Sequence, residues 1–196
     1  MKLVLASQSP SRRMLLERAG VNPLLRPAEI DEEALIRALP HSSPADTVAT
    51  LARAKAEKIA GDFPTDVTVG GDSMLLLGGT LQGKPHTVEA TIARWKAQRG
   101  RTAELLTGHA VHYRGQWYSD TVATTIHFGQ VSDADIEAYA FSGEPLECAG
   151  AFTLEALGSW FIDSIDGDAT SVIGLSMPLL RRALYQFGLD VSSFWD

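Results

Sequence analysis

Three serines and two arginines stand together near the start of the chain, within residues 7–13 (SQSPSRR). Ser9 followed by Pro10 is typical of a helix N-cap and first helical position, and the apolar run before it predicts a short strand. The free N–H groups of a helix N-terminus favour an anion. This pattern predicts a phosphate-binding cradle, although a capped helix with ordinary exposed arginines is the alternative. The predicted cradle residues are Ser7, Ser9, Arg12 and Arg13.

A single carboxylate, Asp72, follows two glycines between the apolar runs Val67–Val69 and Met74–Leu77. These runs predict two strands that are split by residues 70–73. A carboxylate placed where glycines allow close approach can bind a divalent metal or take a proton from water. The alternative is an aspartate that stabilises a turn or a bulge.

Residues 78–84 (GGTLQGK) match the first seven positions of a P-loop. The eighth position must be Ser or Thr to hold magnesium, and here it is Pro85. Proline also disfavours helical backbone at the residue before it, so the loop-to-helix geometry fails. We therefore reject a P-loop phosphotransferase and keep Lys84 as a cation near the strand that follows Asp72.

Three further features carry charge or metal-ligating groups. Asp31 and Glu32 are predicted to present an acid at the end of a short strand. Lys55 lies on a predicted helix, where its ammonium either faces a cleft or extends along a partly buried surface. His109 and His112 are three residues apart in a predicted strand, hence on opposite faces, which excludes paired metal ligation.

The elements that must position these residues follow from hydrophobic spacing and capping signals. Helices are predicted to begin at or beside Ser9, Pro44, Thr87, Ser132 and Pro178. Strands are predicted at residues 3–6, 67–69, 74–77, 103–113, 117–128 and 160–162, with turns at 78–79 and 165–168. The long runs 103–113 and 117–128 predict a hairpin. The fold class is therefore α/β, with a mixed, twisted sheet and flanking helices.

Composition limits the class of protein further. The chain has 196 residues, with 17 Lys and Arg against 24 Asp and Glu, a net charge of −7 and a single cysteine. This length fits one domain or two closely joined lobes. The acidic balance argues against binding of a nucleic-acid polymer through its backbone. No apolar stretch approaches the ~18–20 residues of a membrane span, so we expect a soluble, cytoplasmic protein.

In their order along the chain, these features resemble the Maf family, also called septum formation inhibitor-like nucleotide pyrophosphatases. The segments that carry the resemblance are Leu3–Pro10 with Arg12-Arg13, Asp31-Glu32, Ala54–Ala56, Gly71-Asp72, Gly83–Pro85, Thr107-Gly108, Ala149–Phe152, Ile165–Asp168 and Val172–Leu175. The resemblance implies one Maf-like domain over residues 1–196. It also implies an elongated, two-lobed architecture related to inosine triphosphate pyrophosphatases, with a central cleft.

The same resemblance implies an enzyme that hydrolyses a nucleoside triphosphate to the monophosphate and pyrophosphate, and so removes non-standard or excess nucleotides. It implies a divalent cation, Mg or Mn, and a possible homodimer. Asp72 matches the general base, and Glu32 and Asp72 are the expected metal ligands. The positions expected to line the triphosphate site are Ser7, Ser9, Arg12, Glu32, Lys55 and Lys84.

Base selectivity is where the chain departs from the family branches. The branch that acts on dTTP and UTP carries Arg, Thr and Gln at three selectivity positions, and the 7-methylguanosine triphosphate branch carries Trp, Gln and Glu. This chain has Ser11, Ser73 and Glu155. Because a carboxylate accepts hydrogen bonds, Glu155 suits the N–H edge of a guanine-like base. We expect a guanine-type or broad substrate range.

A non-catalytic nucleotide-binding regulator of cell division is the alternative that the family name suggests. Such a protein needs the phosphate cradle but no general base and no metal-binding acids. Asp72, Glu32 and Lys84 are all present, which favours the enzyme.

Overall fold

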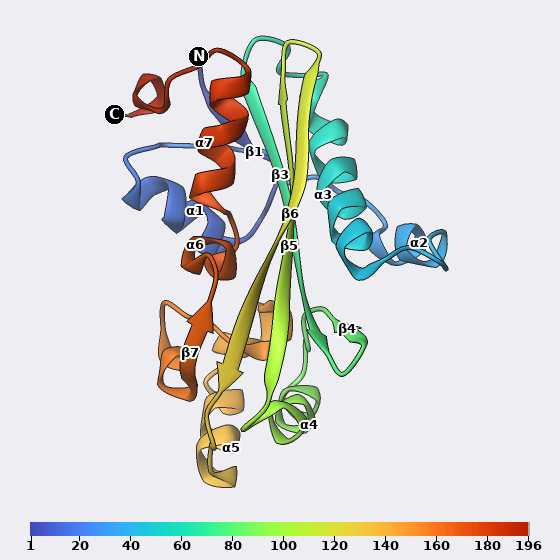
Figure 1. Cartoon of the computed structure of the whole chain (residues 1–196), viewed down its shortest axis with the longest axis vertical. Coiled ribbons are helices and arrows are strands. Elements are labelled where there is room, and N and C mark those ends of the chain that lie inside the picture. Colours follow the sequence, from blue (N-terminus) through green and yellow to red (C-terminus); the bar gives the residue numbers. More distant parts are fainter. Residues whose placement is uncertain (196) are drawn as a thin grey trace. The chain divides into compact units, whose positions relative to one another are not determined.

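The computed structural model describes residues 1–195 of the chain (Figure 1). Its strands are β1 (Leu3–Leu5), β2 (Leu24–Leu25), β3 (Val67–Leu77), β4 (Thr80–Gln82), β5 (Thr102–Tyr113), β6 (Gln116–Phe128) and β7 (Ile162–Asp166). Its α-helices are α1 (Pro10–Arg18), α2 (Glu32–Arg37), α3 (Pro44–Ala60), α4 (Val88–Gln98), α5 (Asp133–Phe141), α6 (Ala169–Ile173) and α7 (Met177–Gln186). Short 3₁₀ helices are η1 (Glu144–Glu147), η2 (Ala149–Ala151), η3 (Leu157–Phe161) and η4 (Val191–Phe194).

The strands form one mixed sheet in the order β2-β1-β3-β5-β6-β7, and β4 pairs with β3. Strand β1 runs parallel to β2 and to β3, with Val4 opposite Thr68. The β3–β4 and β6–β7 pairs are antiparallel. This arrangement confirms the predicted α/β class with a mixed sheet. None of the helices within residues 1–195 is long and apolar enough to cross a membrane.

The chain divides into two compact units. The first comprises Met1–Asp72, Thr107–Val122 and Gly174–Asp196, and the second comprises Ser73–Leu106 and Ala123–Ile173. Strands β3, β5 and β6 contribute residues to both units. Each unit has its own hydrophobic cluster, so the cores are described separately.

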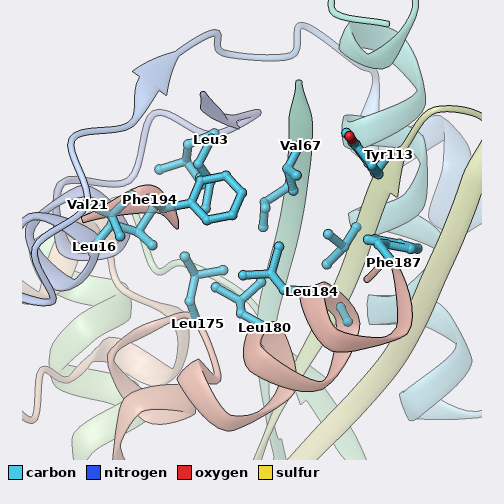
Figure 2. Close-up of a cluster of buried hydrophobic side chains, with 14 residues drawn as sticks. Leu3, Leu16, Val21, Val67, Tyr113, Leu175, Leu180, Leu184, Phe187 and Phe194 are labelled. Atoms are coloured by element: carbon cyan, nitrogen blue, oxygen red, sulfur yellow. The ribbon is translucent and has the colours of Figure 1, made fainter. Parts of the chain in front are cut away.

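The core of the first unit lies where α1, α7 and η4 pack on β1 and β3. Figure 2 shows labelled side chains of this cluster gathered between those elements, together with Tyr113 of β5 and the loop residues Val21 and Leu175. Leu16 of α1 and Leu5 of β1 are fully buried, and Leu180 and Leu184 supply the inner face of α7. This packing fixes the N-terminus of α1 beside the end of β1.

The core of the second unit is built around Trp95 of α4. Its indole makes edge-to-face contacts with Phe128, Tyr139 and Phe161, at centroid distances of 5.5, 5.8 and 5.6 Å. Such contacts between aromatic rings add to the free energy gained by burial. The indole Nε1 donates a hydrogen bond to the carbonyl of Ala151 at 2.7 Å, so the one polar atom of this side chain is satisfied.

Strand β3 runs without a break through residues 70–73, so the predicted split into two strands is wrong. The two glycines are not turn residues, because neither has a positive φ. A Cβ at Gly70 would lie 2.2 Å from the carbonyl oxygen of Ala52 in α3. The glycine is therefore required by the close approach of a helix to the strand.

The predicted strand at 160–162 is also wrong. The chain forms η3 there, and β7 begins only at Ile162. Phe161 packs on Trp95, whereas the Trp160 side chain is 85% exposed. The apolar triplet has a strand-like composition, but sequence alone does not show that its first two residues complete the 3₁₀ helix η3. Strand β7 extends through Asp166, which shortens the turn predicted over residues 165–168.

Several predicted boundaries are confirmed by caps. Side chains of Ser9, Thr87 and Ser132 accept hydrogen bonds from the first turns of α1, α4 and α5. Gly78 and Gly79 form the predicted turn after β3, with φ of +58° and +83°. These signals are local in sequence, since each depends on a residue and the few positions that follow it.

Replacing Gly70 by alanine is expected to destabilise the protein by about 3 kcal/mol, because the new Cβ meets helix backbone that cannot rotate away. Gly61→Ala is the matched control, since Gly61 has a right-handed φ of −62° and nothing within 4 Å of its Cβ position. The control should leave the free energy of unfolding unchanged or raise it by up to about 1 kcal/mol. Urea unfolding measures both variants. Equal stability of the two would contradict the close approach.

Candidate active site

A buried ion pair joins α3 to β3 in the first unit. The Lys55 Nζ lies 2.6 Å from Asp72 Oδ1 and 2.8 Å from Glu32 Oε1. Lys55 and Asp72 are buried, whereas the Glu32 side chain is 47% exposed. One ammonium thus holds two carboxylates that come from separate segments of the chain.

The alternation of side chains along β3 places the carboxylate on the correct face. Successive residues of a strand point to opposite faces, so Gly70 and Asp72 share the face that α3 covers. Gly71 points the other way, where a Cβ would lie 3.3 Å from the Arg12 Nε. Because β3 is continuous, this assignment of faces is fixed by the β3 register.

The close packing of α3 brings Lys55 down to the carboxylate. Ala52 and Ala56 are fully buried on either side of it, and Gly108 of β5 would place a Cβ 2.3 Å from the Val48 carbonyl oxygen. With only small side chains at this contact, the helix lies directly on the sheet. Lys55 therefore ends in an ion pair and does not extend to solvent. The alternative in which its side chain runs along a partly buried surface is wrong.

Burial has a measurable effect on the carboxylate. It raises the pKa of Asp72 above its ordinary range, although the Lys55 ammonium and the Arg12 guanidinium oppose the shift and Glu32 adds to it. Within the part of the chain that the structure describes, the second oxygen, Oδ2, is buried and has no hydrogen-bond partner. A buried acceptor without a partner costs free energy, so this oxygen marks a place that a ligand or water can fill.

The Arg12 guanidinium is held in a slot between two glycines. Its Nε donates to the Gly174 carbonyl at 2.9 Å, and its Nη1 donates to the Ser7 Oγ at 3.1 Å. Gly174 has a φ of +138°, and a Cβ there would lie 2.9 Å from the Arg12 Cγ. Burial lowers the pKa of Arg12 against the charges of Asp72 and Glu32, and the group remains a cation at neutral pH.

The segment that carries Gly174 is itself anchored. The Ser176 N–H donates to His109 Nε2 at 2.8 Å, and the Ser176 hydroxyl caps α7. His109 therefore has a structural role in β5. Gly174 and Gly71 are functional residues that the sequence reasoning missed. The only available signal was their presence in the segments of family resemblance, because 162 residues separate Gly174 from Arg12.

The other residues of the predicted cradle have local roles. Ser7 Oγ accepts the Ser9 N–H at 3.1 Å, and Ser9 Oγ accepts the Arg12 N–H at 3.4 Å. Arg13 pairs with Glu17 at 2.7 Å on the exposed side of α1. Ser11 is half-buried in the first turn of the same helix. The structure thus brings together Ser7, Arg12, Glu32, Lys55 and Asp72.

Glu32 reaches this cluster from a helix, whereas the sequence predicted the end of a strand. Asp31 caps α2 by accepting the Ala34 N–H at 2.8 Å, and Glu32 is the first helical residue. The prediction of a strand here was wrong, because Asp31 followed by two glutamates forms an N-cap and an acidic first turn, which favour a helix.

Ser73, Lys84 and Glu155 belong to the second unit. Ser73 follows Asp72 in β3, so its side chain points to the opposite face of that strand. Lys84 Nζ lies 3.2 Å from Glu147 Oε2, and Glu155 Oε2 accepts the N–H of Leu154 at 3.0 Å. These contacts leave the predicted roles of the three residues as predictions.

The donor set fits a divalent cation that is shared with a phosphate ligand. Within residues 1–195 there is no group of three or more His, Cys, Asp or Glu side chains that could enclose a metal. Magnesium, however, is commonly bound by one or two carboxylates together with substrate phosphates. Glu32 and Asp72 supply two carboxylates, and the unpartnered Oδ2 of Asp72 is an oxygen of the required kind.

Comparison with known proteins covers nearly the whole chain. The family described as Maf-like protein matches residues 2–187. The chain is 66% identical over 195 residues to a Corynebacterium aurimucosum protein named nucleoside triphosphate pyrophosphatase, covering 100% of this chain and 98% of that relative. Proteins of the same name from Corynebacterium diphtheriae and Nocardia farcinica are 64% identical over 196 residues and 51% identical over 203 residues. They cover 100% and 98% of this chain, and 99% and 96% of their own lengths.

Replacing Gly174 by alanine is expected to displace Arg12 and to weaken the binding of pyrophosphate about tenfold, measured by calorimetric titration. Gly188→Ala is the matched control, because Gly188 has a φ of +72° but nothing within 4 Å of its Cβ position. Both variants place an alanine at a positive φ, which residues other than glycine rarely adopt. Only Gly174→Ala should lose affinity, and equal affinities for the two would refute the slot.

Proposed function

The chain belongs to the Maf family, and on that premise we propose that it hydrolyses a nucleoside triphosphate at the α-phosphorus, releasing a nucleoside monophosphate and pyrophosphate. The single observation that carries this proposal is the buried Asp72, whose Oδ2 has no hydrogen-bond partner among the described residues and which lies beside two buried cations. The same premise supports removal of non-standard or excess nucleotides as its role.

Asp72 is placed to accept a proton from an attacking water. Its Oδ1 is held by Lys55 at 2.6 Å, which fixes the carboxylate and leaves Oδ2 either for the water itself or for a divalent cation that would orient the water. A general base works best when its pKa lies near the operating pH, and burial shifts the pKa of Asp72 in that direction. An ordinary exposed aspartate would be a weaker base.

The cations are placed to stabilise the charge that develops on phosphate oxygens. Attack at the α-phosphorus concentrates negative charge on its non-bridging oxygens and on the leaving pyrophosphate. Arg12 is preorganised by two hydrogen bonds, so it does not need to reorder as that charge appears. Lys55 is held by two carboxylates and can exchange one of them for a phosphate oxygen. Ser7, Ser9, Arg13 and Lys84 remain predicted substrate ligands.

Glu32 and Asp72 would hold the divalent cation, for which Mg or Mn suits the oxygen donors. When bound, such an ion neutralises phosphate charge and orients the triphosphate. It also adds positive charge that a chain with a net charge of −7 lacks.

We propose a guanine-type or broad range of bases, with selectivity carried by Ser11, Ser73 and Glu155. The carboxylate of Glu155 accepts hydrogen bonds, which suits the N1–H and amino group of guanine. A serine at position 11 provides neither the stacking surface of Trp nor the charge of Arg. The substrate is a free nucleotide and not a nucleic-acid polymer. We also propose that the protein acts in the cytoplasm and forms a homodimer.

The free-energy cost of burying the Lys55–Asp72 pair argues against a nucleotide-binding regulator that has no catalytic activity. A carboxylate and an ammonium buried together lose hydration, and a protein that only binds phosphate gains nothing from an additional buried carboxylate. Catalysis gives that carboxylate a function.

Replacing Asp72 by asparagine is expected to lower kcat by about 10²–10⁴-fold while the protein stays folded, because the amide cannot accept the proton. Incubation with mixed nucleoside triphosphates and magnesium or manganese, followed by phosphorus NMR, identifies the products. Asp62→Asn, on an exposed aspartate, is the matched control and should keep full activity. Diphosphate with orthophosphate as products, or pyrophosphate release by Asp72→Asn at the wild-type rate, would contradict the proposal.

A further inference from the structure

A second carboxylate, Glu144, is the centre of a hydrogen-bond network in the second unit. It accepts four hydrogen bonds, from the Tyr139 hydroxyl at 3.1 Å, the Thr153 hydroxyl, and the N–H groups of Leu157 and Gly158 at 3.1 and 3.0 Å. Three of the four go to Oε1, and the Leu157 N–H goes to Oε2. Four donors on one carboxylate are more than the capping of a single helix requires.

The partners of Glu144 are the two ends of one loop. Residues 153–158 leave at Thr153 and return at Gly158, and both ends donate to the same carboxylate. Gly158 N–H also donates to the Thr153 hydroxyl at 3.2 Å, and Thr153 N–H donates to the Tyr139 hydroxyl at 3.2 Å. A Cβ at Gly158 would lie 2.5 Å from the Tyr139 hydroxyl, so the loop closes only with glycine there.

The network also requires the charged form of Glu144. Burial would raise the pKa of Glu144, but the hydrogen bonds from Thr153, Gly158 and Leu157 outweigh it and lower that pKa. A carboxylate is an acceptor only and can take several donors at once. No other protein side chain can accept all four of these hydrogen bonds in this place.

The loop that Glu144 closes carries Glu155. The Glu155 Oε2 accepts the N–H of Leu154, so this side chain is tied to the backbone of its own loop. Its location therefore follows the loop conformation, and the loop conformation depends on Glu144. Among the described residues, Glu155 makes no hydrogen bond with Glu144.

We infer that Glu144 is a positioning residue for base selectivity, which acts by fixing the 153–158 loop and thereby the acceptor carboxylate of Glu155. This inference rests on the proposed function, since it assigns the loop to the nucleotide base. Glu144 has no part in the proposed phosphate cradle or in the proposed proton transfer. It sets which base is preferred through the geometry of the loop.

The substitution Glu144→Gln separates this role from a general one. An amide retains one oxygen for the Tyr139, Thr153 and Gly158 donors, but its NH₂ then faces the Leu157 N–H that Oε2 accepted at 3.1 Å. Two donors at that distance repel each other, so the loop opens on the Leu157 side with little change of volume.

The test measures binding of GTP and UTP by calorimetry in the Asp72→Asn background, where the nucleotide is not consumed. We expect Glu144→Gln to reduce the ratio of the UTP dissociation constant to the GTP dissociation constant by about tenfold or more. Asp133→Asn is the matched control, because Asp133 is another carboxylate of this unit whose pKa its partner Arg99 lowers, but it does not contact the loop. The control should leave the ratio unchanged.

Tyr139→Phe provides a milder second variant that removes one hydroxyl while keeping the aromatic packing on Trp95, and it should shift the ratio in the same direction. Equal weakening of both nucleotides by Glu144→Gln or Tyr139→Phe overturns the inference. Absence of any nucleotide binding by the wild-type chain overturns it together with the proposed function. A third outcome overturns the proposed function alone. In it, the two variants reduce base selectivity as expected, but the wild-type chain releases no pyrophosphate.

Discussion

The buried ion pair between Lys55 and Asp72 is the interaction on which the rest of the site depends. Two charges removed from water repay their lost hydration only when they meet at close range with good geometry. That requirement explains why α3 lies so close to β3 that a Cβ at Gly70 would strike helix backbone. It also explains why Ala52 and Ala56 flank the lysine, since a larger side chain at either position would lift the helix and separate the charges.

Arg12 is positioned by the same principle from the other face of the strand. Glycine at positions 71 and 174 leaves a slot just wide enough for the side chain, and a backbone carbonyl and a serine hydroxyl fix its orientation. The uninterrupted β3 strand places Gly70 and Asp72 on one face and Gly71 on the other, so a single strand register aligns both cations with one carboxylate. A bulge within residues 70–73 would destroy that alignment.

The sequence predicted whatever is encoded locally. Caps at Ser9, Thr87 and Ser132 and the turn at Gly78-Gly79 depend on neighbouring positions, and the structure confirms them. The glycines of β3 do not break the strand, because each is required by a contact with a distant segment: Gly70 by the Ala52 carbonyl of α3 and Gly71 by the Arg12 side chain.

The site shows the same limit of local information. Residue types alone suggested Arg12, Lys55 and Asp72 as candidates, yet the Lys55 Nζ contacts and the role of Gly174 appear only when distant segments come together. Family resemblance supplied their roles, and packing supplies the physical reason for their geometry.

Two partly or fully buried carboxylates of this chain have opposite environments, and the contrast separates reactivity from structure. Glu144 accepts four hydrogen bonds, which lower its pKa and keep it charged and saturated. Asp72 is more deeply buried, has a raised pKa and retains one oxygen without a partner among residues 1–195. A saturated carboxylate can only hold its donors in place, whereas a proton acceptor needs an available lone pair and a pKa above the ordinary range. The hydrogen-bond environment of each group therefore supports the proposed roles, Asp72 in the chemistry and Glu144 in positioning.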